Sequence, residues 1–252
     1  MGHDTTSVGT ADTAAGLPEV IRRVEGSSRL GLPFTDLKVP IDQCRVALLS
    51  GAGIYPSETI PFRDAPSEAW LREIARDRSA ESLALDPHEF SAAEAPYDLN
   101  SLFPIERLVE LENEGCIGAA AKRHFSLSPW SNPVSQVFES TLRGLTESCI
   151  SDDTQLVIGI APGADGALPV ILALRTLEAA GVSTALVSVA PREALSVSVT
   201  RGYYLDFPAT CPFGAPTDRM LQRNILLDCF HLLPRLRAGD WVELPYHWPK
   251  PF

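Results

Sequence analysis

The chain has 252 residues, 45% of them hydrophobic, and a formal net charge of −11. This size and apolar content suffice to bury a full core, and the negative charge disfavours nucleic acid and membrane surfaces as partners. No apolar stretch reaches the roughly 20 residues that a membrane-spanning helix needs, and the N-terminus lacks the pattern of a signal peptide. We therefore expect a soluble, cytoplasmic protein.

Five cysteines are spread widely along the chain and are never spaced as CxxC. This pattern predicts neither a disulfide framework nor a zinc site, and no closely spaced pair of ligands indicates another metal. We expect no cofactor. Isolated cysteines are usually small buried hydrophobic residues, and Cys211 is the one whose surroundings suggest chemistry.

The N-terminal half of the chain gives few periodic signals. Residues 1–16 are small and polar, which predicts a disordered tail before a single α/β domain over 17–252 or two lobes at about 17–130 and 131–252. The apolar run 45–50 predicts a short buried strand that ends in the glycine turn 51–53. Residues 56–103 contain several prolines and predict a long irregular excursion, with a short helix over 68–76.

The second half is more regular. Helices are predicted from Pro104 to near Gly115 and over 133–149, where apolar residues recur at helical spacing. The strand LVIGI, a turn, a helix ending near Gly181 and the strand STALVSVA then form a βαβ unit, which implies two parallel strands. A strand in RGYYLDFP and a final helix in TDRMLQRNILLDCFHLLPRL follow. We expect a three-layer, Rossmann-like α/β fold with a mostly parallel sheet.

The turn GIAPGADGALP, residues 159–169, follows the first strand of the βαβ unit. Its glycines match neither the GxGxxG nor the phosphate-loop spacing. Gly163 can shape a tight turn while Asp165 caps the helix. The alternative is a ligand site, because ligands of open α/β sheets bind beyond the carboxyl ends of strands, near helix N-termini. Since 46–53 also ends in a glycine turn, pseudo-symmetric halves would place Ser50 opposite Asp165 across a pocket.

Several tracts in order resemble the selenoprotein B family of glycine, sarcosine and betaine reductases and the related D-proline reductase subunit. They are PHEF, YDLNSLFPIERLVELENEGCIG, RHFSLS, the βαβ unit and YYLDFPATCPFGAP, between about residues 45 and 245. The segment DLN-x-x-FPIERL-x-EL-x-x-EG-x-IG is the sharpest. The resemblance implies a soluble bacterial α/β protein that reductively cleaves a carbon–nitrogen bond with a pyruvoyl-containing partner subunit.

This sequence departs from the family at the turn after the first strand of the βαβ unit. Family members carry a selenocysteine or cysteine there, usually with a second cysteine nearby, whereas residues 161–166 contain neither sulfur nor selenium. The reductive cleavage needs a selenolate or thiolate to attack and a thiol to close the bridge. We therefore expect the fold and a small-molecule pocket to be kept and the reaction to differ. Asp165 in this turn suggests acid–base work or ammonium binding.

Further candidates come from the matching tracts. His88 and His124 occupy the positions of histidines beside aromatic residues, where they are candidate general bases or, alternatively, packing residues. Asp98 and Asn100 form the D-x-N element, which fits substrate binding or a turn before a helix. Cys211 lies before a predicted helix and is a candidate thiolate nucleophile or an inert buried thiol.

Three functions from different classes fit these observations. The preferred one is a diverged enzyme that acts on a small amine, amino acid or thiol compound by acid–base or cysteine chemistry. The second is a reductase that cleaves a carbon–heteroatom bond and draws electrons through Cys211 or a partner's thiol. The third is a non-catalytic subunit of an enzyme complex. The sequence leaves open whether a partner subunit or a homo-oligomer is formed.

Overall fold

A computed structural model of the chain describes residues 31–65, 70–86, 97–128, 133, 135–161, 163, 167–195 and 197–248. The strands of its central sheet are β1 (Arg45–Ser50), β3 (Leu71–Ala75), β5 (Ala119–Ala120), β6 (Arg123–Leu127), β7 (Leu156–Ala161), β8 (Ser183–Ser188), β9 (Arg201–Tyr204) and β10 (Asp240–Glu243). Within the described residues this eight-stranded sheet has the order β10-β9-β8-β7-β1-β6-β3, and β5 also pairs with β1.

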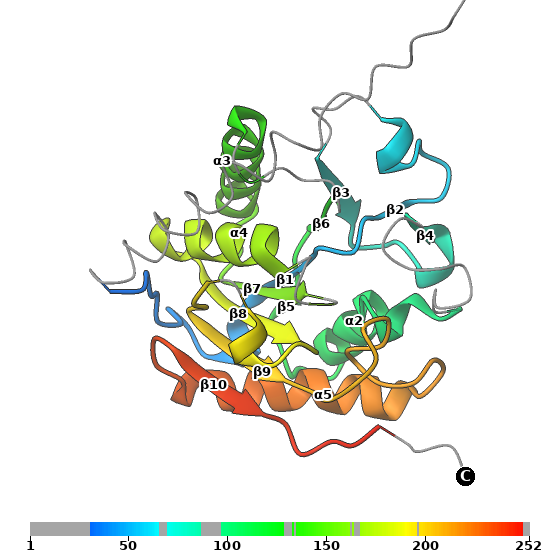
Figure 1. Cartoon of the computed structure of the whole chain (residues 1–252). Coiled ribbons are helices and arrows are strands. Elements are labelled where there is room, and N and C mark those ends of the chain that lie inside the picture. The colour runs from blue at the N-terminus through cyan, green and yellow to red at the C-terminus, as the bar shows by residue number, and fades with distance from the viewer. Residues whose placement is uncertain are drawn as a thin grey trace, which may run out of the picture.

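Helices cover both faces of the sheet (Figure 1). They are α2 (Ile105–Asn113), α3 (Gln136–Ser151), α4 (Ala167–Ala179) and α5 (Arg219–Leu232). In the described sheet β3 runs antiparallel to β6 and the other neighbours are parallel. The predicted α/β fold with a mostly parallel central sheet is therefore confirmed. A Rossmann-like arrangement, pseudo-symmetric halves and the division into lobes stay predictions, and the tail 1–16 lies outside the described residues.

The alternation of side chains along β1 explains the three layers. Val46 and Leu48 pack into the hydrophobic cluster shared with α2 and α5, whereas Ala47 and Leu49 belong to the cluster shared with α3 and α4. Because successive residues of a strand point to opposite faces, an apolar run such as 45–50 is typical of a strand buried on both sides.

The βαβ unit forms as predicted, with β7 and β8 parallel and α4 between them in the chain. Gly159 in β7 lets α4 approach closely, because a Cβ at this position would lie 2.6 Å from Cδ1 of Leu174. The three other helices begin and end close to the predicted positions. Ser135 caps α3 by accepting a hydrogen bond of 3.1 Å from the N–H of Phe138.

The described parts of 56–103, which are 56–65, 70–86 and 97–103, contain more regular structure than the sequence suggests. The predicted helix over 68–76 is wrong, because Leu71–Ala75 form β3, which pairs with β6 along its whole length. Pairing with a neighbouring strand outweighs weak local preference in such short segments. In addition, β2 (Ile54–Pro56) and β4 (Leu83–Leu85) form a two-stranded antiparallel sheet. Within the described residues, no helix is long and apolar enough to cross a membrane.

Candidate functional site

A cavity of about 690 Å³ lies beside β4. The chain passes from β1 through the turn 51–53 into β2, and β2 pairs with β4, which forms one wall. The other walls are η3 (Ala80–Ser82), η4 (Leu99–Ser101) and the first turns of α2 and α5. The volume is within the range of small-molecule sites, about 300–1,000 Å³. Five charged residues line it: Glu81, Asp98, Glu106, Arg107 and Arg219.

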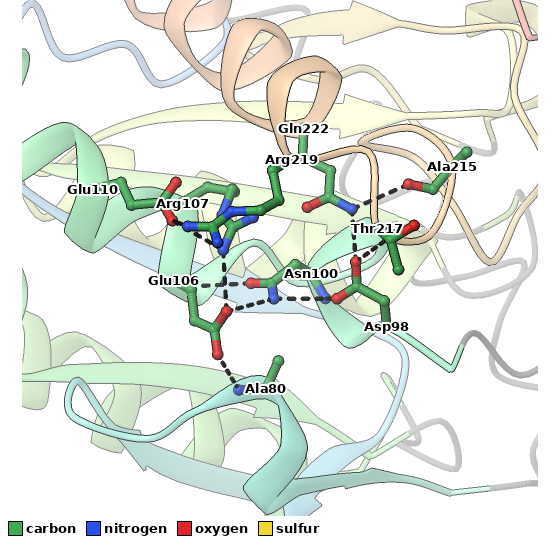
Figure 2. Close-up of polar contacts among 10 residues, drawn as sticks. All are labelled: Ala80, Asp98, Asn100, Glu106, Arg107, Glu110, Ala215, Thr217, Arg219 and Gln222. Carbon is green, nitrogen blue, oxygen red and sulfur yellow. Dashed lines mark hydrogen bonds and ion pairs between the residues drawn. The ribbon is translucent and has the colours of Figure 1, made fainter.

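Asp98 connects η4 to the start of α5 through four hydrogen bonds (Figure 2). Its Oδ1 accepts hydrogen bonds from the backbone N–H and the Nδ2 of Asn100, at 3.0 and 3.2 Å. Its Oδ2 accepts from the N–H of Thr217 at 2.8 Å and from Nε2 of Gln222 at 2.9 Å. Burial alone would raise the pKa of Asp98, but the hydrogen bonds from Gln222, Thr217 and Asn100 lower it below its usual value. The carboxylate is therefore ionised at neutral pH.

Asn100 connects Asp98 to α2. It is 4% exposed, and its Nδ2 also donates to Oε2 of Glu106 at 3.0 Å, while its Oδ1 accepts from the N–H of Glu106 at 3.2 Å. Oε1 of Glu106 accepts from the N–H of Ala80 at 3.0 Å, which links α2 to η3. Asn100 thus satisfies its amide inside the protein, which favours a role in holding the wall over a direct role in binding.

Two arginines meet at Glu110 on the same wall. The Nη2 atom of Arg107 lies 3.1 Å from Oε2 of Glu106 and 3.1 Å from Oε1 of Glu110. Arg219, the first residue of α5, pairs with the same oxygen of Glu110. Arg107 is 3% exposed, whereas the side chain of Arg219 is 69% exposed. Among the described residues, Nε of Arg107 has no hydrogen-bond partner.

Backbone strain occurs at the edge of this site. Thr217 has a φ of 67° in the left-handed region, which is a genuine outlier for a β-branched residue. Such a conformation costs on the order of 1–3 kcal/mol and persists only where the surroundings impose it. The N–H of Thr217 donates to Asp98, and the next residue, Asp218, caps α5 by accepting from the N–H of Leu221 at 3.0 Å. The strained residue therefore sets the start of α5.

The structure brings together some of the predicted site residues. Asp98 and Asn100 line the cavity, and Cys211 belongs to the neighbouring tract, since the N–H of Phe213 donates to the carbonyl of Ser101 at 2.9 Å. Cys211 itself is 6% exposed, and its Sγ lies 3.6 Å from Oγ1 of Thr210. The described residues contain no group of ligands suited to a metal ion.

His124 and Ser50 lie inside the core, away from this cavity. Both are 0% exposed. Nδ1 of His124 accepts a hydrogen bond of 3.1 Å from the N–H of Leu48, and its ring meets Phe103 edge-on at 6.2 Å between centroids. Burial, and secondarily the charge of Arg76, lowers the pKa of His124 to about 3. These surroundings favour a neutral structural histidine over a general base.

Ser50 completes a turn. Its Oγ accepts from the N–H of Ala52 at 3.1 Å, at the carboxyl end of β1. Gly163 is half-buried, and a Cβ placed there would meet no atom of the described residues within 4 Å. His88 and Asp165 lie outside the described residues, so their roles, and the pairing of Ser50 with Asp165, stay predictions.

Sequence reasoning missed Glu106, Arg107, Arg219 and Gln222. Glu106 and Arg107 stand inside the FPIERL segment, the sharpest part of the family resemblance, which was a usable signal. Arg219 and Gln222 lie more than a hundred residues from Asp98 in the chain, so local sequence patterns could not link them to it. The hydrogen bond between Asp98 and Gln222, for example, spans 124 positions.

The fold and this site define an α/β protein with a charged cavity between β4 and the first turns of α2 and α5. No family model and no solved structure matches the chain. Among curated proteins it is similar to the D-proline reductase subunit gamma of Acetoanaerobium sticklandii, with 21% identity over 216 residues. The alignment covers 85% of this chain and 89% of that protein. The chain therefore has a distant similarity, over most of both lengths, to a subunit of a reductase.

Proposed function

We propose that this chain is a diverged relative of the D-proline reductase subunit that binds a small amine or amino acid in the charged cavity. The proposal rests on one observation, which is the part of the sequence that forms the cavity wall. The tract that most resembles the reductase family, residues 98–118, supplies Asp98, Glu106 and Arg107 to the same cavity.

The charges of the cavity suit a molecule with an ammonium group. Glu81 is exposed at the cavity and has no hydrogen-bond or ion-pair partner among the described residues, and Glu106 borders the same space. Asp98 already accepts four hydrogen bonds, so it is a weaker candidate for a ligand contact. Arg219, whose side chain is 69% exposed, lines the same cavity and can bind a carboxylate, so the site offers both charges that a zwitterion requires.

Thiol chemistry has less support. Burial raises the pKa of Cys44 to about 11 and that of Cys149 to about 12, and the pKa of Cys229 is raised as well. These thiols stay protonated and inert at neutral pH. Cys211 is buried and does not line the cavity. The proposal therefore assigns any catalysis to acid–base groups, with His88 and Asp165 as the candidates from the sequence.

Calorimetric titration tests the proposal. D-proline, L-proline and pyrrolidine are titrated into the wild-type chain and into Glu81→Gln and Arg219→Gln. We expect binding to the wild type and at least about tenfold weaker binding to one of the variants, which corresponds to about 1.4 kcal/mol. Arg237→Gln is the matched control, because its side chain is 72% exposed and pairs with one carboxylate, as does that of Arg219. Equal affinity in all variants would contradict the proposal.

A non-catalytic subunit is the second candidate, because the similar protein is itself a subunit of a reductase. It predicts a partner chain that co-purifies in fixed stoichiometry and no binding of the three probes. The reductase alternative predicts turnover of D-proline with a dithiol, lost in Cys211→Ser. Variants of His88 and Asp165 that abolish turnover without a change in Tm would support acid–base catalysis.

A further inference from the structure

The hydrogen bonds of Asp98 do more than cap the turn in which this residue lies. Two of the hydrogen bonds of Asp98 stay within its own segment, but the other two reach Thr217 and Gln222, at 2.8 and 2.9 Å. Gln222 is 0% exposed and its Nε2 also donates to the carbonyl of Ala215 at 3.1 Å. One carboxylate therefore holds both the strained residue that precedes α5 and the first turn of the helix.

Arg219 depends on this arrangement. It lies between Thr217 and Gln222 in the chain, and its N–H donates to the carbonyl of Thr217 at 2.9 Å. Its guanidinium pairs with Glu110 of α2, beside Arg107 (Figure 2). The conformation of Thr217 therefore sets the path by which the chain enters α5 and the position from which the Arg219 side chain extends toward Glu110.

We propose that Asp98 is a positioning residue, which fixes the left-handed conformation of Thr217 and the first turn of α5 and so places Arg219 at the binding cavity. Asp98 acts on the ligand through Arg219 and does not touch it. The inference rests on the proposed function, because it assigns the placement of a ligand-binding arginine in that same cavity.

The strain at Thr217 provides a direct test. Asp98→Asn keeps the size of the side chain but has one acceptor oxygen in place of two, so it cannot accept all four hydrogen bonds and its NH2 group must face two of the four donors. Thr217→Gly removes the Cβ that makes the left-handed conformation unfavourable, so the turn no longer needs Asp98 to hold it. If Asp98 acts by positioning, the second substitution rescues the first.

The experiment measures the Kd of the more tightly binding proline enantiomer for wild type, Asp98→Asn, Thr217→Gly and the double variant, well below every Tm. We expect about tenfold weaker binding in Asp98→Asn, recovery to within about threefold in the double variant and little change in Thr217→Gly. Asp64→Asn is the matched control, since Asp64 is an exposed acid paired with Arg63 and does not line the cavity. Unchanged affinity in Asp98→Asn, or a loss that Thr217→Gly does not rescue, would overturn the inference.

Hydrogen exchange separates this inference from the proposed function. We expect the amides of 217–223 to exchange faster in Asp98→Asn and to be protected again in the double variant. If neither proline enantiomer binds the wild-type chain, the proposed function fails and the exchange pattern alone decides the inference, which an unchanged pattern overturns. If Asp98→Asn does not fold, Gln222→Ala removes one of the four contacts and is expected to show a smaller change in the same direction.

Discussion

The imidazole of His124 accepts a hydrogen bond of 3.1 Å from the backbone N–H of Leu48, at the break between β5 and β6. β1 pairs with β5 at its start and with β6 at its end, so the N–H of Leu48 faces the interruption between them. The side chain supplies the acceptor that a continuous neighbouring strand would provide, and it does so as a neutral ring.

This bond predicts a dependence of stability on pH. The pKa of His124 is lowered to about 3 in the folded chain, against about 6.5 when it is exposed. Between these values the unfolded state binds the proton and the folded state does not, so stability falls as pH decreases from about 6.5 toward 3. The comparison is with His124→Asn, which retains a hydrogen-bond acceptor but does not titrate. As pH decreases, we expect the free energy of unfolding of the wild type to fall more steeply than that of this variant, by up to about 1.4 kcal/mol per pH unit.

Urea unfolding at pH 7, 6 and 5 measures both slopes. Because the acidic residues are the same in the two proteins, their contributions cancel in the comparison. Parallel slopes would show that His124 does not titrate as its burial implies.

Alanine substitution is expected to have opposite effects on stability at Gly159, where α4 approaches β7 closely, and at Gly144 of α3. Gly159→Ala places a Cβ 2.6 Å from Cδ1 of the buried Leu174, so we expect a loss of about 1–3 kcal/mol from overpacking. Gly144→Ala in α3 meets no atom within 4 Å and should stabilise the chain by up to about 1 kcal/mol, through helix propensity. Thermal unfolding of the two variants measures these effects. A Gly159→Ala variant with the Tm of the wild type would show that α4 can move away from β7 without loss of stability.

The ion pair between Glu178 and Arg201 predicts a large loss of stability. The two side chains are 0% and 2% exposed and lie 2.9 Å apart, and Arg201 also donates to the carbonyl of Thr35. Glu178→Gln leaves a buried guanidinium without its counter-charge, so we expect a loss of about 3–5 kcal/mol. Arg237→Gln, which alters an exposed pair at 3.9 Å, should change the free energy of unfolding by less than about 1 kcal/mol. Similar losses of unfolding free energy in the two variants would show that the buried pair between Glu178 and Arg201 contributes no more to stability than the exposed one.

The cysteines differ in access to solvent, which predicts an order of alkylation. Cys116 is half-buried, whereas Cys211 is 6% exposed. We expect a thiol-specific alkylator to modify Cys116 first and Cys211 more slowly than in an unfolded control, with the sites located by peptide mass mapping. Rapid modification of Cys211 would instead support the reductase that works through this thiol.

Strong local patterns allowed much of the fold to be predicted. The apolar run of β1, the βαβ unit and the helix after Pro104 follow from periodicity and caps that lie within each segment. β3 was predicted as a helix because it pairs with β6, whose residues lie about 50 positions away in the chain, as in Ile74 opposite His124. Local sequence carries no trace of such a partner.

The candidate site was predicted less completely for the same reason. Asp98 and Asn100 were found because they stand in a tract that resembles a known family. Arg219, which lines the cavity, and Gln222, which hydrogen-bonds Asp98, were missed because both lie more than a hundred residues from Asp98 in the chain. The burial of His124 could not be read from a histidine flanked by aromatic and polar residues.

The hydrogen bonds from Thr217 and Gln222 to Asp98 also determine when the cavity can exist. During synthesis the wall of η4 and α2 leaves the ribosome more than a hundred residues before α5, and until then Asp98 lacks two of its four donors. A nascent chain, or a fragment that stops before residue 217, has the central strands β1, β7 and β8 but lacks the complete cavity. The proposed ligand binding therefore requires that synthesis has passed α5 and that this helix has packed against Asp98.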